Sequence, residues 1–241
     1  IWNTATGAKS LQVNTTGNYN SAFGKLALYS TTTGTGNTAS GYGALKANTT
    51  AQYNVAMGYA ALRANTTGAS NTASGAFALG INVSGINNTA VGYHSLKVNT
   101  SGFANTASGV YSLYKNSTGS FNSAFGISSL YNNTTGTNNT AFGRIALLKN
   151  ETGSYNTALG NNADVEFNNL ENATAIGNSA IVSASNTIQL GNINVTNVKT
   201  SGTLTAGAIT YPNKDGISGQ LLTTTGTGTL TWTSTYDTRI T

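Results

Sequence analysis

The feature that most constrains this chain is a small polar motif that returns at a fixed distance. The pentapeptide NTASG occurs at residues 37–41, 71–75 and 105–109, so its copies are evenly spaced. We call the glycine that closes this motif, or its equivalent in a related copy, the anchor glycine. Anchor glycines recur at every seventeenth position, at Gly7, Gly24, Gly41, Gly58, Gly75, Gly92, Gly109, Gly126, Gly143, Gly160 and Gly177. Unrelated globular sequence does not keep such a register, so the chain is an array of repeats.

Each repeat follows the pattern Asn-Thr/Ser-Ala-x-Gly-x-x-Ala/Ser-Leu-x-x-Asn-Thr-Thr-Gly-x-x. A leucine follows the anchor glycine by four positions, and a second glycine follows by ten in most copies, with Ala51 as an exception. The unit is too short for helical repeats, which need about 33 residues, and its Gly, Asn, Thr and Ser residues compete with helix. Two short strands and two turns fit, because Thr-Ala-x-Gly alternates like a strand and Asn-Thr-Thr-Gly has turn residues.

We therefore predict an all-β fold. Residues 1–180 should form a parallel β-solenoid (β-roll) of about 11 repeats, used as a shaft or head, with coils ~4.8 Å apart. Like residues then stack in columns, asparagine on asparagine and threonine on threonine, and the Ala and Leu columns face inward. Residues 181–241 should form a β-rich neck or collar cap, because the next motif ends at Gly191, which is closer to Gly177 than the regular step allows. Turn-like segments at 213–216 and 226–228 predict hairpins there.

The spacing of the identical NTASG copies is twice the step between anchor glycines and needs its own explanation. The residue before the anchor glycine alternates between small and large, in the order Thr6, Phe23, Ser40, Met57, Ser74, Val91, Ser108 and Phe125, until Phe142 breaks the series. Either large and small residues interdigitate on successive coils of one repeat each, or one coil spans two repeats and has two unlike sides. We favour the first interpretation, because it packs densely without crowding.

One column of such coils buries little apolar surface. One Leu and two Ala per repeat gain only a few kcal/mol at ~25 cal/mol per Å², whereas ordering the repeat costs on the order of 1.5 kcal/mol per residue. Packing the exposed apolar face against other copies would supply the missing burial. We therefore expect a homotrimer with closed cyclic symmetry.

The composition of the chain limits which kinds of molecule we expect it to bind. Charged residues make up 7% of the chain, and the net charge of +5 comes from cations scattered singly, which does not indicate a nucleic-acid partner. No apolar run approaches the ~20 residues of a membrane helix, so we expect no membrane insertion. Cysteine is absent. Because there is no initiator Met or signal-peptide pattern at Ile1, we expect a processed or trimmed piece of a longer protein.

The residues that catalysis needs are scarce, so we expect no enzyme, no cofactor and no metal. The only histidine, His94, has no cysteine or second histidine to work with, and its column indicates a structural role. Asp164, Glu166 and Glu171 fall in one irregular turn, which we interpret as a solvated loop in preference to a cation site. The glycosylation-like sequons at Asn48, Asn65, Asn99 and Asn116 are better explained as stacked turn asparagines.

Two columns carry residues suited to recognition. The residues directly after the anchor glycines include Tyr42, Tyr59 and Tyr93, and the residues after the column leucines include Lys46, Arg63 and Lys97. Stacked along a solenoid, these side chains form ridges that would suit a cell-surface glycan or an anionic envelope polymer. These six residues are our candidate receptor or glycan contacts. The alternative is that they are spaced surface residues that keep the fibre soluble.

The repeats also resemble a known family. The segments NTAVGYHSL (88–96), NTASGVYSL (105–113) and NSAFGISSL (122–130) resemble the repeats of trimeric phage tail fibres. They are also similar to the left-handed β-roll heads of trimeric autotransporter adhesins, although the repeat here is longer than the fourteen-residue unit of those heads. Ile209–Ser234 looks like the segment before the self-cleaving chaperone domain of many tail fibres. The resemblance implies a trimer, other fibre or baseplate proteins as partners, and a place in a virion tail or on a bacterial surface, outside the cell.

From these features we predict a structural fibre or adhesin: a rigid trimeric shaft for attachment to a host or target cell, in a phage tail, a tail-like injection apparatus or a bacterial surface adhesin. The alternative is an ice-binding or other flat-faced solenoid, since threonines recur in pairs such as Thr15-Thr16, Thr49-Thr50 and Thr66-Thr67. A polysaccharide-cleaving tail spike would need paired carboxylates, which the repeats lack.

Overall fold

A computed structural model describes residues 2–199, 201, 204–206, 209–211, 216–224 and 230–234. These residues form strands, turns and bends without any helix, and so none of them belongs to a helix that could cross a membrane. The chain divides into two compact units, Ile1–Asn194 and Val195–Thr241, which are described separately.

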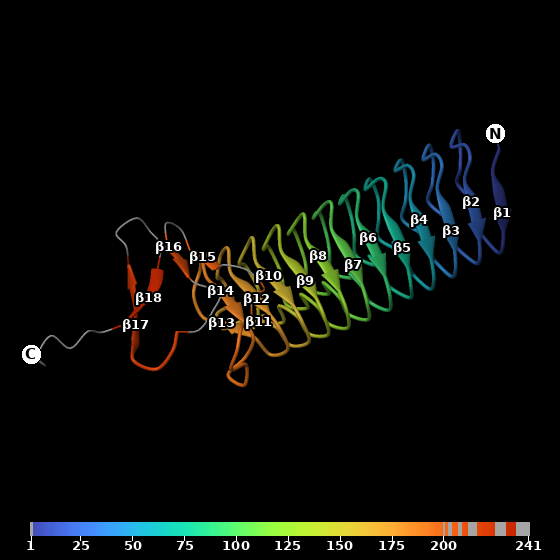
Figure 1. Cartoon of the computed structure of the whole chain (residues 1–241). Helices are drawn as coiled ribbons and strands as arrows, with labels where there is room; N and C mark the ends of the chain where they lie inside the picture. The colour runs from blue at the N-terminus through green and yellow to red at the C-terminus, as the bar shows by residue number, and fades with distance from the viewer. Residues whose placement is uncertain are drawn as a thin grey trace, which may run out of the picture. The chain divides into compact units, whose positions relative to one another are not determined.

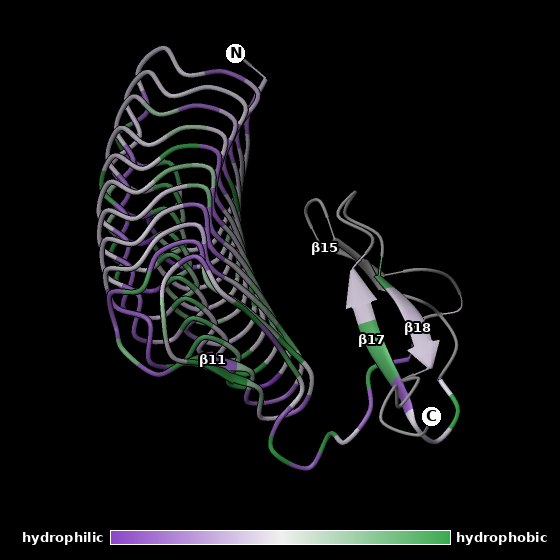
Figure 2. Cartoon of the chain, turned by 60° about the vertical axis from the view of Figure 1, so that its left-hand side comes forward, coloured by the Kyte–Doolittle hydropathy of each residue, from purple (hydrophilic) through white to green (hydrophobic). Residues whose placement is uncertain are grey.

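The first unit is a stack of coils built on one parallel sheet (Figures 1 and 2). Twelve strands pair in the order of the chain. They are β1 (Thr4–Thr6), β2 (Ser21–Phe23), β3 (Thr38–Ser40), β4 (Val55–Met57), β5 (Thr72–Ser74), β6 (Thr89–Val91), β7 (Thr106–Ser108), β8 (Ser123–Phe125), β9 (Thr140–Phe142), β10 (Thr157–Leu159), β12 (Thr174–Ile176) and β14 (Ile188–Leu190). The predicted parallel β-solenoid of about 11 turns is confirmed.

The pairing register fixes the length of a coil. Ala22 pairs with Ala39, and Ala39 pairs with Ala56, so each strand lies beside the equivalent strand of the next repeat. The same shift holds for every pair from β1 to β12. A coil therefore consists of one repeat, and the alternative of two repeats per coil is wrong. The alternating column before the anchor glycine points outward: Phe23 and Met57 are 44% and 46% exposed, so the alternation does not pack the interior.

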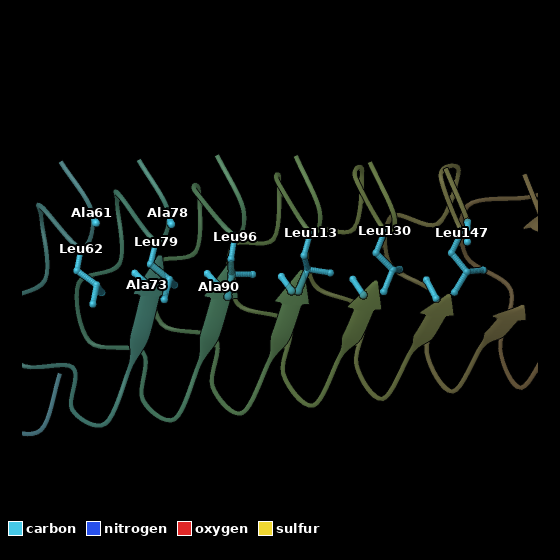
Figure 3. Close-up of a cluster of buried hydrophobic side chains, with 14 of the residues drawn as sticks. Ala61, Leu62, Ala73, Ala78, Leu79, Ala90, Leu96, Leu113, Leu130 and Leu147 are labelled. Carbon is cyan, nitrogen blue, oxygen red and sulfur yellow. The ribbon is translucent and has the colours of Figure 1, made fainter. Parts of the chain in front are cut away.

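The core consists of three columns that face inward, as predicted (Figure 3). The middle residue of the strands from β1 to β12 in this sheet is Ala, and it is buried in every coil from Ala22 to Ala175. The second column holds Ala or Ser, such as Ala44 and Ser95, and the third holds Leu. The eight leucines from Leu28 to Leu147 are fully buried. Small residues in two columns let opposite walls of the coil approach closely, which is why so short a coil has a filled interior.

The rest of each coil differs from the prediction. We expected two strands per coil, but the coils of β1 to β9 have one strand of three residues, and turns and bends occupy most of the rest. The reason is the backbone of the leucine column, where Leu62 has φ 49° and Leu96 has φ 50°. The left-handed conformation costs roughly 1–2 kcal/mol per residue, which is comparable to the ~1.5–3 kcal/mol gained by burying a leucine. Burial of the side chain thus holds the backbone out of a strand.

Two asparagine columns link the coils, as predicted. In the first, the backbone N–H of Asn71 donates to Oδ1 of Asn54 at 3.0 Å, and its Nδ2 donates to the same atom at 3.2 Å and to the carbonyl of Gly85 at 2.8 Å. In the second, Nδ2 of Asn99 donates to Oδ1 of Asn82 at 2.7 Å. These asparagines are fully buried, so each amide replaces its lost water with bonds to the coils around it.

The anchor glycines are required by the stacking itself. Gly109 has φ 141°, and a Cβ there would lie 2.4 Å from the carbonyl oxygen of Gly126 on the next coil. The second glycine column is equally crowded: a Cβ on Gly102 would lie 2.3 Å from the carbonyl oxygen of Gly119. The glycines therefore set how closely neighbouring coils can approach.

The last coils of the first unit are built differently, and we call residues 161–194 the closing coils. Asp164 takes the place of the column leucine, and its backbone is extended in β11 (Asp164–Val165), which pairs with β13 (Ile181–Val182). The register then shortens, because Thr174 pairs with Ile188, which lies closer along the chain than the regular step. The sheet ends at Leu190, beyond the residue 180 at which the sequence places the end of the shaft.

The second unit contains two antiparallel hairpins. The strands β15 (Leu204–Ala206) and β16 (Ile209–Tyr211) pair, and so do β17 (Gln220–Thr224) and β18 (Leu230–Ser234). Of the turns predicted there, 226–228 and most of 213–216 lie outside the described residues. The role of this unit as a collar stays a prediction.

Candidate functional site: an exposed aromatic and basic face

The segment that follows each anchor glycine has a backbone that divides its side chains between core and solvent. The second and fourth residues are left-handed, as at His94 (φ 57°) and Leu96 (φ 50°). The third and fourth side chains, Ser95 and Leu96, point into the core, while the first, Tyr93, is 44% exposed. Because every coil repeats this geometry, the first, second and fifth positions form neighbouring columns on one outer face.

The predicted tyrosines lie on this face, but they do not form one continuous column. The rings of Tyr42 and Tyr59 are stacked, with centroids 5.3 Å apart, and the two side chains are 42% and 50% exposed. The next coil has Ala76 at this position, which separates Tyr59 from Tyr93. The row is bridged by Phe77, one position further along the repeat, whose ring lies 5.2 Å from that of Tyr59.

His94 is at the centre of this face and is in contact with four rings. Its imidazole stacks on Tyr93 at a centroid distance of 3.9 Å and lies 5.1 Å from Phe77 and 5.3 Å from Tyr111. It also stacks on Tyr114 at 5.9 Å. Neither ring nitrogen has a hydrogen-bond partner among the described residues. Burial, and secondarily the charge of Lys97, lower the pKa of His94, so the imidazole is a neutral packing element.

The ring contacts continue beyond His94. Tyr111 contacts Tyr114 at 5.5 Å, and Tyr114 stacks on Tyr131 at 5.1 Å. Contacts between rings are thus continuous from Tyr42 to Tyr131. The candidate list from the sequence omits Phe77, His94, Tyr111, Tyr114 and Tyr131. Their repeat positions were available as a signal, but only the structure shows that the second and fifth columns adjoin, because left-handed residues turn the chain between them.

Of the three predicted cations, Lys97 lies beside the rings, and so does Lys115, which was not on the candidate list. Nζ of Lys97 is 5.2 Å from the ring centroid of Phe77 and 5.9 Å from that of Tyr114, and Nζ of Lys115 is 5.5 Å from Tyr131. Lys46 and Arg63 line a shallow hollow of about 410 Å³ together with Ser30, Ala47, Ala64 and Gly80. Distances of this size allow cation–π attraction, which holds the ammonium groups over the rings without neutralising them. We call the side chains that are not buried among the first six residues after each anchor glycine the basic aromatic face.

Three of the acidic residues lie in the closing coils. Asp164 is buried, whereas Glu166 and Glu171 are exposed, and the described residues contain no group of three potential metal ligands. Burial raises the pKa of Asp164 to about 6, against the opposing effect of hydrogen bonds from the backbone N–H groups of Val165 and Lys149. The charged form of Asp164 is therefore unfavourable in the core, and the hydrogen bonds that it accepts come from backbone N–H groups.

Two other sequence features have a structural explanation. The sequon asparagines Asn48, Asn65, Asn99 and Asn116 are fully buried members of the second asparagine ladder, as predicted. The threonine row is used internally: the hydroxyl of Thr66 donates to the carbonyl of Val83 on the next coil, and Thr134 does the same to Glu151. Val83 and Glu151 themselves interrupt this row, whereas the next position of the repeat holds an exposed Thr or Ser in every coil from Thr16 to Thr152.

A second exposed surface follows the outer side of the sheet. Its third strand residues become apolar on consecutive coils, and they are 37–57% exposed: Phe125, Phe142, Leu159, Ile176 and Leu190. We call these five residues the apolar sheet strip. In earlier coils the same column alternates between large residues and Thr or Ser.

Comparison with known proteins adds no assignment to either surface. No protein-family model matches the sequence, and neither curated proteins nor solved structures include a match.

Proposed function

We propose that this chain is a structural attachment fibre: a rigid homotrimeric shaft, outside the cell, that joins a larger assembly to a host or target cell surface. A phage tail, a tail-like injection apparatus or a bacterial surface adhesin would use such a shaft in the same way. Fibre or baseplate proteins would be its partners in that assembly.

The stack of coils is the observation that carries the proposal. Twelve parallel strands and two buried asparagine ladders connect each coil to the next with hydrogen bonds, and no long loop interrupts them between β1 and β10. Such a stack resists bending and offers few open segments to proteases. Three copies would present the same outer surface three times, which raises the strength of attachment without new contacts.

The apolar sheet strip supports the trimer. Five large apolar side chains on consecutive coils, with Phe142 57% exposed, form a row that a soluble single column would leave in water. Covering this row with sister chains buries it and adds the apolar area that each thin column lacks. Closed threefold symmetry satisfies all three copies without leaving an open interface.

The first experiment measures the mass of the particle in solution. Sedimentation equilibrium should give three times the mass of one chain, and F125S/F142S/L159S should shift the particle toward one chain. The matched control F103S/F121S/Y155S removes three rings of similar exposure outside the strands and should leave the trimer intact. A wild-type chain that stays monomeric at micromolar concentration would reject the trimeric fibre.

The second experiment addresses attachment. Fluorescently labelled protein is mixed with a panel of bacterial cells and bound label is counted by flow cytometry. We expect saturable binding to some strains that excess unlabelled protein prevents. If no strain in a broad panel is labelled, a purely structural shaft without attachment is the better description.

A further inference from the structure

The charges of this chain are segregated along its length and around its coils. Residues 1–150 contain eight Lys or Arg residues and no Asp or Glu, and all six acidic residues follow. The eight cations are Lys9, Lys25, Lys46, Arg63, Lys97, Lys115, Arg144 and Lys149. Each of them falls between the first and the sixth position after an anchor glycine, which places all eight on the basic aromatic face.

Solubility alone does not explain this distribution. Cations that only keep a fibre soluble would be expected on several faces, since any exposed position serves that purpose. Here the strands and the Asn-Thr-Thr-Gly corners of residues 1–150 have none. The result is a positive stripe with about one cation per coil, and coils lie about 4.8 Å apart. Such a stripe attracts an extended polymer that carries negative charges at a similar spacing.

The rings beside the cations add a second requirement for the ligand. Continuous contacts from Tyr42 to Tyr131 form a row of aromatic side chains along the solenoid axis, several of which are about half exposed. Aromatic rings bind sugars through the apolar faces of pyranose rings, and tyrosine hydroxyl groups add hydrogen bonds. The hollow lined by Lys46 and Arg63 gives this row a depression beside Gly80, which has no side chain to fill it.

Spacing of the rings leaves no room for a nucleic-acid base between neighbouring rings of the stacked pairs. The stacked pairs Tyr42–Tyr59 and Tyr114–Tyr131 have centroids 5.3 and 5.1 Å apart. Inserting a base between two rings requires roughly 7 Å, twice the distance between stacked bases. A sugar packs on one open face or edge of a ring, which the existing arrangement provides, and a base that stacks on one ring in the same way is tested below with oligo-dT.

We propose that the basic aromatic face binds an anionic polysaccharide, with carboxylate groups on its sugar units, that lies along the solenoid axis. The carboxylates contact Lys46, Arg63 and Lys97, and the pyranose rings pack on Tyr42, Tyr59 and Tyr93. The inference rests on the proposed attachment function and specifies the class of surface polymer that the shaft contacts.

The test uses two probes with the same sugar backbone. Binding of the full chain to polygalacturonate is measured by biolayer interferometry, and fully methyl-esterified polygalacturonate serves as the uncharged counterpart. We expect saturable binding to the acid form, at least about tenfold weaker binding to the ester, and a clear loss of affinity when salt is raised from about 50 mM to about 300 mM. A single-stranded oligo-dT is measured in parallel.

Matched variants locate the site. Y42A/Y59A/Y93A should weaken binding to polygalacturonate about tenfold or more, because each exposed ring provides one stacking contact. The control Y19A/Y53A/Y155A removes three tyrosines that are 60–62% exposed but lie outside the face, and it should change affinity less than twofold. K46Q/R63Q/K97Q should reduce both the affinity and its salt dependence, whereas K199Q should not. Circular dichroism and melting curves verify that each variant is folded.

Three results would overturn the inference: no saturable binding to polygalacturonate, equal losses in the face and control variants, or tighter binding to oligo-dT that the face variants abolish. Sedimentation and cell labelling test the proposed fibre separately. A trimer that labels cells but ignores polygalacturonate leaves the attachment function in place and removes only the polysaccharide.

Discussion

The regular coils of residues 2–160 and the closing coils of residues 161–194 show what the repeat requires. A regular coil places a leucine in a left-handed backbone and stacks two asparagines on those of its neighbours, and the regular coils contain eight cations and one acid, Glu151. In the closing coils, Asp164 lies where the leucine was and Ala173 follows Asn156 in the first ladder. The backbone there becomes extended and pairs as β11 and β13.

The difference teaches that the side chains, and not the backbone alone, hold the regular coil in its shape. Where leucine is absent, the left-handed conformation is absent at that position too. Where asparagine is absent, Ala173 still donates its N–H to Oδ1 of Asn156 at 2.9 Å but offers no acceptor to a further coil. The ladder is thus closed by a residue that needs a partner on one side only.

The largest expected loss of stability comes from replacing an anchor glycine, and it should differ between the regular and the closing coils. Gly109→Ala places a Cβ 2.4 Å from the Gly126 carbonyl oxygen, whereas the nearest atom to a Cβ on Gly177 is Cα of Gly191 at 3.2 Å. We expect Gly109→Ala to lower the free energy of unfolding by about 4 kcal/mol or more, and Gly177→Ala by about 1–3 kcal/mol, mostly from its positive φ. Chemical denaturation of both variants measures this. Equal losses of unfolding free energy in the two variants would show that the close approach of neighbouring coils is not the reason why the anchor position requires glycine.

The next largest loss of stability is expected from a substitution in the first asparagine ladder. Asn105→Ala removes the acceptor of the Asn122 backbone N–H and of Asn122 Nδ2 in the buried interior, and it leaves the Gly119 carbonyl with Asn116 as its remaining side-chain donor. A loss of about 2–4 kcal/mol is expected. Asn161→Ala breaks an exposed asparagine pair with Asn178 in the closing coils and should cost less than about 0.5 kcal/mol. Comparable melting temperatures for the two variants would contradict the ladder as a stabilising element.

Asp164 predicts an unusual dependence on pH. Its pKa is raised from 3.8 to about 6 in the folded chain, so the folded state holds a proton that the unfolded state has lost between these values. The cost of the buried carboxylate, up to about 3 kcal/mol, is present in full above pH 6 and disappears as pH falls toward 4. The closing coils should therefore become more stable on mild acidification. Asp164→Asn should remove this gain, and hydrogen exchange of residues 161–194 at pH 4.5 and 7 measures it. Unchanged pH dependence in the variant would contradict the assignment.

His94 lies in the regular coils. Its contribution should make the folded chain less stable on acidification, which is opposite to the effect of Asp164, and it should be smaller. Its lowered pKa means that the unfolded chain binds a proton near pH 6.5 that the folded chain resists, so stability falls as pH drops below that value. His94→Phe keeps the ring contacts and should change stability by less than about 1 kcal/mol at pH 7.5, while melting at pH 5 should occur at a higher temperature than in the wild type. A variant that is less stable than wild type at both values would indicate a role for the imidazole nitrogens.

Much of the solenoid was predictable because the spacing of its recurring side chains determines the register between coils. Asn, Ala, Leu and Gly recur at fixed positions, and only stacked coils of equal length bring such residues together, so the columns around Ala56 and Asn54 follow from spacing alone. The left-handed leucine backbone was not predictable, because tertiary burial overrides its local preference. For the same reason the second strand was wrongly expected, and the contact between Phe77 and His94 was missed. The extension of the sheet to Leu190 depends on a shorter coil that breaks the period.

Thermal unfolding of two deletion variants tests the central claim, that like residues stack at intervals of one repeat, most directly. Removing residues 76–92 takes out one whole coil and joins Gly75 to Tyr93 in register, whereas removing residues 76–91 takes out one residue fewer. We predict that the first variant keeps the β-rich circular dichroism and cooperative melting of the wild type, and that the second loses cooperative melting because every later column is displaced from its partners. Equal tolerance, or equal collapse, of the two deletions would contradict the account.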